Sequence, residues 1–242
     1  MRLSVLLAAL PLLASVAQAD IPDLLRQAIE RSDDGPIYPF DIERTATFEG
    51  EDDDDGETER TGYARVDLAA PELKQITPAH LIDPNKPGSS FRALGGIETA
   101  LEDGIWCTRF GDNLPPDEDD YEIIAEDDLS ITFEFTPEAS GDADGPEKKI
   151  AKNTRVKVTV SKDDPAVLRF SSALRRSVRL FVVAQLKKID VDATCARAPD
   201  GRTYVEELTS EIVTSGPGAG NQGSRMAITA LYDPETGDQV TP

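Results

Sequence analysis

Histidine and cysteine are nearly absent from this sequence of 242 residues, which contains one His and two Cys. The single histidine, His80, is not accompanied by the G-x-S-x-G motif of many serine nucleophiles, so no Ser-His-Asp triad is indicated. We expect His80 to lie in an ordinary loop. Cys107 and Cys195 form no C-x-x-C pair, and with one His they are too few for a zinc site. The sequence therefore predicts no metal centre and no cofactor.

Long apolar runs are missing everywhere except at the N-terminus. Residues 1–19, MRLSVLLAALPLLASVAQA, join a basic start to a short apolar core and small terminal residues, the pattern of a signal peptide. Cleavage is predicted between Ala19 and Asp20, which leaves one domain over residues 20–242. No later segment approaches the ~20 apolar residues of a transmembrane helix. We therefore predict an exported chain, periplasmic or secreted, without a membrane span.

Basic residues are few in comparison with acidic ones. The chain has 25 Lys and Arg against 46 Asp and Glu, a net charge of −21. Such a chain repels nucleic acid and anionic lipid headgroups through general electrostatics, so neither is expected as a partner. The excess indicates either a strongly solvated surface or a specific role in binding cations.

The two cysteines are an even number in a chain predicted to reach an oxidising compartment. This favours one disulfide between Cys107 and Cys195, with two unrelated buried thiols as the alternative. Trp106, the neighbour of Cys107, is expected to pack in the core against that disulfide.

Two segments show helical periodicity. Near the mature N-terminus, Ile21, Leu24, Leu25, Ala28 and Ile29 form an apolar stripe with helical spacing. This predicts an amphipathic helix over residues 21–31 that must dock on another surface. A second, inserted helix is predicted over residues 91–103, although Gly95 and Gly96 weaken it by about 1 kcal/mol each relative to Ala.

The remaining segments alternate with period two, which predicts strands. About nine to eleven strands follow one another, mostly through short polar turns, and a phase shift near Lys187-Lys188 indicates a β-bulge. The fold class is therefore mainly β with α: a curved antiparallel sheet, or half-barrel, with one N-terminal and one inserted helix. The expected strands include 40–49, 61–69, GIWCTRF, YEIIAE, LSITFEFT, 155–160, 178–186, 189–195, YVEELTSEIVT and RMAITALY.

Several conspicuous segments are interpreted as ordinary turns. The acidic stretch at residues 49–59 partly matches a calcium loop with Gly56 in sixth place, but the twelfth position is Gly62, so a hairpin tip is favoured. Residues 216–223, GPGAGNQG, lack the Lys-Ser/Thr ending of a phosphate loop and are predicted to form a hairpin. GDADGPEKK is expected to be a loop tip. The basic pairs Arg175-Arg176 and Lys187-Lys188 are expected to pair with carboxylates.

The layout resembles a known group of proteins. A helix DIPDLLRQAIERS leads into a strand with F-x-I-x-x-x-A-x-F spacing, then an antiparallel meander, and finally a D-P-x-T-G turn from Asp233 to Gly237. This is similar to the periplasmic lipoprotein carriers of the LolA/LolB type. The resemblance implies an incomplete barrel that wraps around helices and holds acyl chains in an apolar cavity. It assigns no individual cavity residue.

We therefore expect a non-enzymatic binding or carrier protein for an apolar, acyl-chain or lipid-like ligand. The alternative is an acidic secreted structural or interaction protein with a filled core. A third hypothesis is a hydrolase that uses an unrecognised carboxylate pair. An open apolar hollow would favour the carrier, a solid core the interaction protein, and a cleft with raised carboxyl pKa values the hydrolase.

Overall fold

The computed structural model describes residues 22–33, 35–50, 58–71, 75–83, 85, 105–108, 114–139, 143, 145–181, 183–216 and 219–240. Several predicted features lie outside these residues: the signal peptide 1–19, its cleavage site at Ala19 and Asp20, the helix over 91–103, and residues 51–57 of the acidic stretch. None of the helices in the described ranges is long and apolar enough to cross a bilayer.

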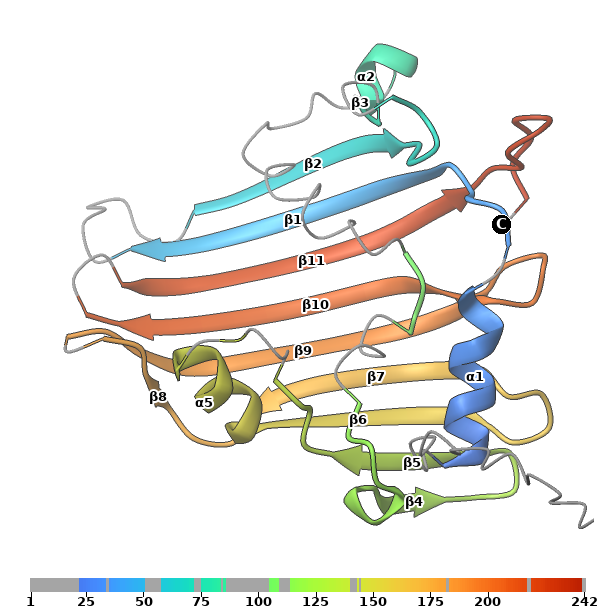
Figure 1. Cartoon of the computed structure of the whole chain (residues 1–242). Coiled ribbons are helices and arrows are strands. Elements are labelled where there is room, and N and C mark those ends of the chain that lie inside the picture. Colours follow the sequence, from blue (N-terminus) through green and yellow to red (C-terminus); the bar gives the residue numbers. More distant parts are fainter. Residues whose placement is uncertain are drawn as a thin grey trace, which may run out of the picture.

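Within the described residues, eleven strands form one antiparallel sheet, which is curved and does not close (Figure 1). Their order is β3-β2-β1-β11-β10-β9-β7-β6-β5-β4, and the short β8 pairs with β9 off this path. The predicted fold class is confirmed. The strands are β1 (Phe40–Gly50), β2 (Thr58–Val66), β3 (Ile76–Pro78), β4 (Glu122–Glu126), β5 (Ser130–Phe135), β6 (Thr154–Ser161), β7 (Val167–Leu174), β8 (Val178–Arg179), β9 (Gln185–Arg197), β10 (Thr203–Ser215) and β11 (Gly220–Leu231).

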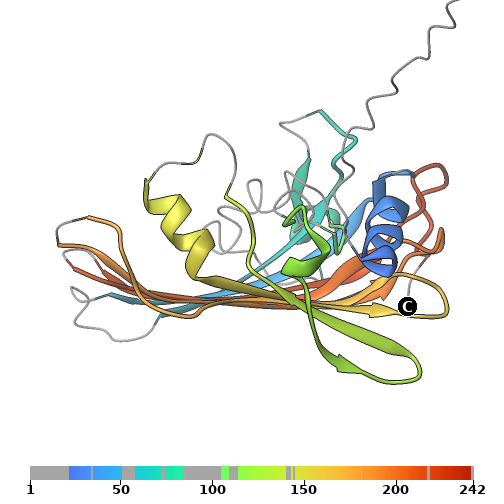
Figure 2. The same cartoon turned by 60° about the horizontal axis from the view of Figure 1, so that its bottom comes forward.

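The helices gather on one side of the sheet, as Figure 2 shows for α1 and α5. We call this side the covered face and the other side the open face. Helix α1 lies across β6 and β7 at one end of the sheet, and α5 lies near β8 at the other end (Figure 1). The described helices are α1 (Asp23–Asp33), α2 (Ala79–Ile82), α5 (Gly145–Asn153) and a 3-10 turn at Glu118–Asp120.

Helix α1 forms where the apolar stripe predicted it. Leu25 and Ala28 are buried in the core, while Leu24 and Ile29 pack partly against it. Burial of this stripe stabilises the helix, because eleven residues are too few for a stable isolated helix. At its C-terminal end, Arg31 forms an ion pair with Asp164, which lies between β6 and β7.

The core follows from the alternation of the strands. In β6, the three valines at 156, 158 and 160 are buried, whereas the intervening residues remain partly exposed. The same alternation buries Ile131, Phe133 and Phe135 in β5. These side chains share the covered face with the stripe of α1, and together they form one continuous core.

The segment from Val178 to Leu186 is not the long strand that its alternation predicted. It forms a hairpin, in which the backbone amides of Leu180 and Phe181 both donate to the carbonyl of Ala184. Val178 and Leu186 pair with each other at the base of this hairpin, and both side chains are buried there. The predicted β-bulge is confirmed, since the pairing of β9 with β10 skips Lys187.

Two further predictions of secondary structure were wrong. GDADGPEKK is not simply a loop tip, because α5 begins at Gly145 and its second residue, Pro146, suits the first turn of a helix. The described part of GIWCTRF, residues 105–108, forms no strand and makes a single bridge between Trp106 and Tyr204.

Candidate functional site

The covered face carries an apolar row that the core does not bury completely. Phe48 in β1 and Ile212 in β10 both stand opposite Gln222 of β11, and Ile212 stands opposite Ile189 of β9. Alternation places Phe48 on the same face as the buried Ala46 and Ile42. We call Phe48, Ile212 and Ile189 the apolar row.

Exposure distinguishes the apolar row from the rest of this face. Phe48 is 39% exposed and Ile212 is 38% exposed, whereas Val158 and Phe133, under the α1 end, are almost fully buried. The sheet is therefore filled at its α1 end and incompletely covered where the apolar row lies. Apolar surface of this kind is what a ligand with an acyl chain would bury.

Polar groups lie beside the apolar row on the same face. The hydroxyls of Ser210 and Ser224 share a hydrogen bond of 2.8 Å between β10 and β11. Arg44 lies two positions before Ala46, and burial lowers the pKa of its guanidinium. The covered face thus combines an apolar strip with a few hydrogen-bonding groups, the composition of many small-molecule sites.

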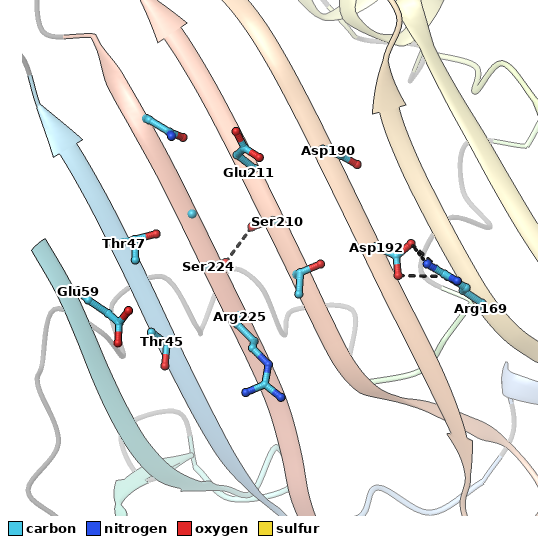
Figure 3. Close-up of a pocket in the computed structure, with 13 residues that line it drawn as sticks. Thr45, Thr47, Glu59, Arg169, Asp190, Asp192, Ser210, Glu211, Ser224 and Arg225 are labelled. Carbon is cyan, nitrogen blue, oxygen red and sulfur yellow. Dashed lines mark hydrogen bonds and ion pairs between the residues drawn. The ribbon is translucent and has the colours of Figure 1, made fainter. Parts of the chain in front are cut away.

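The open face carries a wide polar trough of about 930 Å³ that crosses β2, β1, β11, β10, β9 and β7 (Figure 3). Its charged side chains are mostly paired. Arg169 binds Asp192 through two nitrogens, at 2.7 and 3.1 Å, and Lys188 contacts Glu211 at 2.6 Å. Threonines such as Thr45 and Thr47 fill the spaces between the ion pairs. The trough is a solvated sheet surface in which opposite charges neutralise each other across strands.

The carboxyl groups whose pKa departs most clearly from its ordinary value shift downward. Hydrogen bonds from Arg31 lower the pKa of Asp164, and hydrogen bonds from Arg225 lower that of Glu207. Backbone amides have the same effect on the pKa of Asp127 and Asp233. These shifts hold the groups ionised, whereas a general acid requires a raised pKa.

The predicted disulfide is present. Cys107 and Cys195 are bonded, with their Cα atoms 6.2 Å apart. The bridge fastens the segment around Cys107 to β9, and the amide of Cys107 donates to the carbonyl of Thr203 at 3.0 Å. Trp106 packs partly against the core, as expected. Its ring also lies 3.6 Å from the guanidinium of Arg202. That group is buried and donates to Asp200.

His80 lies in the helical turn α2 rather than in a loop, and its Nδ1 atom is buried with no hydrogen-bond partner among the residues that the structure describes. Across the described ranges, no three His, Cys, Asp or Glu residues gather as a metal site would require. The turn predicted from Asp233 to Gly237 is confirmed, because the Asp233 carboxylate accepts from the amides of Glu235 and Thr236.

The expected pairing of the basic dipeptides is only partly correct. Lys188 pairs with Glu211 and Asp190 on the open face. In contrast, neither Arg175 nor Arg176 forms an ion pair with any carboxylate that the structure places, and both are exposed. The two arginines lie in the turn after β7, where the nearby sequence offers no acidic residue.

No family model matches the sequence, and no curated protein matches it. Among solved structures, the chain is similar to a DUF1329 family protein from Desulfovibrio piger, with 11% sequence identity and a TM-score of 0.33. The match covers 86% of this chain and 90% of that one. A TM-score this low supports no argument about function.

The layout that suggested LolA/LolB-type carriers is present in its coarse features. The chain has an N-terminal helix, an open curved antiparallel sheet, and helices on one face of that sheet. Membership in the LolA/LolB group stays a prediction.

Proposed function

We propose that the protein binds an apolar, acyl-chain-like ligand against the covered face of its sheet, without catalysing a reaction. The observation that carries this proposal is the exposure of Phe48 and Ile212, 39% and 38%, on the face that elsewhere forms the buried core. An acyl chain lying along the apolar row would remove this surface from water. Burial of such surface contributes ~0.8 kcal/mol per methylene.

The curvature of the sheet supports the same proposal. Helices α1 and α5 lie at opposite ends of the covered face of this curved sheet (Figures 1 and 2). The apolar row lies away from the α1 end, because Phe48 and Ile212 are close to the last residues of β1 and β10. A non-catalytic role is supported by the ion pairs of the open trough, because its carboxylates are held by Arg and Lys side chains. An export location, periplasmic or secreted, is part of the proposal and agrees with the disulfide.

A titration with a fluorescent fatty acid tests this function. We expect saturable binding at one site, and we expect Phe48→Glu and Ile212→Glu to weaken it by about tenfold or more, because each introduces a charge into apolar surface. Thr47→Glu is the matched control, since it adds the same charge one residue away on the open face. Equal affinity of all four proteins, or no saturable binding by the wild type, would contradict the proposal.

The second candidate is an interaction protein with a filled core. It is favoured by the tightly buried end under α1 and by the paired charges of the open trough. The same titration separates the two, because an interaction protein would bind no fatty acid at all.

A further inference from the structure

The basic residues of this acidic chain are unevenly distributed. Residues 148–188 contain twelve of its 25 Lys and Arg residues but only two of its 46 acidic residues, Asp163 and Asp164. Five of the twelve form ion pairs: Arg155, Lys157, Lys162, Arg169 and Lys188. The net charge of −21 therefore conceals a strongly positive segment.

The other seven basic residues form what we call the basic corner. All seven are exposed, and none pairs with a carboxylate in the ranges that the structure describes. Unpaired positive charges in a protein with so many carboxylates indicate that they serve a partner rather than the fold. The basic corner consists of Lys148, Lys149 and Lys152 in α5, Arg175 and Arg176 after β7, Arg179 in β8, and Lys187 in β9.

The elements of the basic corner are held together at one end of the sheet. The amide of Arg175 donates to the carbonyl of Asn153, the last residue of α5, at 2.7 Å. Helix α5 contacts β8, and Arg179 of β8 pairs with Gln185 of β9. Figures 1 and 2 both show α5 and the β8–β9 hairpin near each other at this end.

An apolar tip projects from the same place. Phe181 and Val183, in the turn between β8 and β9, are 70% and 67% exposed. Two hydrogen bonds close the turn: the amides of Leu180 and Phe181 donate to the carbonyl of Ala184 at 3.0 and 3.2 Å. Gly216, with φ of +126°, supports it from behind, since any side chain there would collide with the Val183 carbonyl. The exposed side chains of Phe181 and Val183 thus lie at the end of a hairpin that is closed by backbone hydrogen bonds.

We propose that the basic corner and the apolar tip together form a docking surface for an anionic lipid bilayer. Basic side chains attract anionic headgroups, while an aromatic and an aliphatic residue enter the boundary between headgroups and acyl chains. A narrow projecting hairpin suits the deformable headgroup layer better than the flat, packed surface of a protein interface.

The acidic remainder of the protein does not prevent this docking at physiological salt. The Debye length is then about 8 Å, so carboxylates on distant strands are screened from the bilayer, whereas the basic corner contacts it. At about 0.01 M salt the Debye length reaches ~30 Å, and the whole negative chain repels the bilayer. At about 1 M salt it falls to ~3 Å, and the attraction itself is screened. Docking therefore has an optimum at intermediate ionic strength.

The docking surface goes beyond the proposed function and does not depend on it, because its residues are separate from the apolar row. Vesicle flotation tests it. We expect the wild-type protein to float with vesicles of phosphatidylcholine and phosphatidylglycerol (7:3) and not to bind vesicles of pure phosphatidylcholine. Binding to the anionic vesicles should be strongest at intermediate salt concentration. The double variant Phe181→Ser/Val183→Ser should no longer bind these vesicles, while its melting temperature should stay that of the wild type.

A pair of charge variants distinguishes local docking from general electrostatics. Arg175→Gln/Arg176→Gln should lower binding roughly thirtyfold, since each Lys or Arg near such a surface contributes ~1 kcal/mol. Arg169→Gln/Arg225→Gln makes the same change in net charge on the open face and should leave binding unchanged. Equal losses in both pairs would overturn the proposal.

Insertion of the tip can be followed directly. Trp106 is the only tryptophan and is partly buried against the core, so its emission should not respond to vesicles. The variant Phe181→Trp should show a blue shift on adding anionic vesicles. Absence of flotation at every salt concentration, or binding to polyglutamate with anionic vesicles inert, would overturn the bilayer as the partner.

Discussion

Phe48 and Ile212 lie on the same face of the sheet, separated by Gln222 of the intervening strand β11. They come from strands that begin at residues 40 and 203, so no local pattern brings them together. Each keeps nearly two-fifths of its surface exposed, on a face whose other end is filled by α1. We propose that an apolar ligand would bind against this pair.

The disulfide should be a major source of stability. Cys107 and Cys195 are 88 positions apart, and closing a loop of that length contributes roughly 4 to 5 kcal/mol in the chain-entropy model. The free energy of unfolding of the double variant Cys107→Ala/Cys195→Ala should be lower by that amount. The variant should therefore unfold at a lower urea concentration than the wild type. Thiol titration of the unfolded, unreduced wild type provides the control, because two free thiols would show that the bridge does not form.

Docking of α1 should depend on its buried stripe. Leu25 is completely buried, and Leu25→Ala should lower the free energy of unfolding by ~2 to 5 kcal/mol. Leu24→Ala is the matched control, since Leu24 packs only partly against the core and should cost about half as much or less. Urea unfolding measures both. Equal losses would show that the helix docks through another face.

The ion pair between α1 and the β6–β7 turn should make stability depend on pH. Hydrogen bonding from Arg31 lowers the pKa of Asp164 in the folded protein, so its contribution is present above the ordinary pKa of about 3.9 and lost as pH falls. At pH 7, Asp164→Asn should lower the melting temperature by at most about 2 to 4 °C.

The pH profile separates this effect from a general loss of charge. The difference between Asp164→Asn and wild type should shrink as pH falls below about 4. Asp163→Asn removes the same charge from the neighbouring exposed residue and should leave the melting temperature unchanged at pH 7. A deficit in Asp164→Asn that persists at low pH would indicate a packing defect instead.

The acidic stretch at residues 49–59 should be dispensable. Replacing residues 49–57 with Asn-Gly joins β1 to β2 at the pair Phe48–Thr58 and removes seven carboxylates that repel one another. Stability should therefore stay the same or rise slightly in thermal unfolding. Calcium that stabilised the parent by several degrees but not the shortened variant would revive the interpretation of this stretch as a metal site.

Periodicity predicted the elements that bury one face. The stripe around Leu25 indicated α1, and alternation in residues such as Val156, Val158 and Val160 indicated the sheet. Even the bulge at Lys187 was visible as a change of phase. These features are local, because each depends on neighbours within a few residues.

Features that depend on distant neighbours were missed. The alternation from Val178 to Leu186 could not show that the middle of the segment has no strand beside it, so Phe181 and Val183 were assigned to a strand. The helix α5 is only nine residues long and follows a run of turn-forming residues. Net charge averaged over the chain concealed the basic corner, which a count over residues 148–188 would have found.

Native mass spectrometry of the protein purified from its own cellular compartment would show directly whether it carries an apolar ligand. We expect one copurifying molecule of acyl-chain mass per wild-type chain. That molecule should be lost from Phe48→Glu/Ile212→Glu and retained by Thr47→Glu. Ligand-free wild-type protein that also takes up no added fatty acid, or equal occupancy in all three proteins, would contradict it.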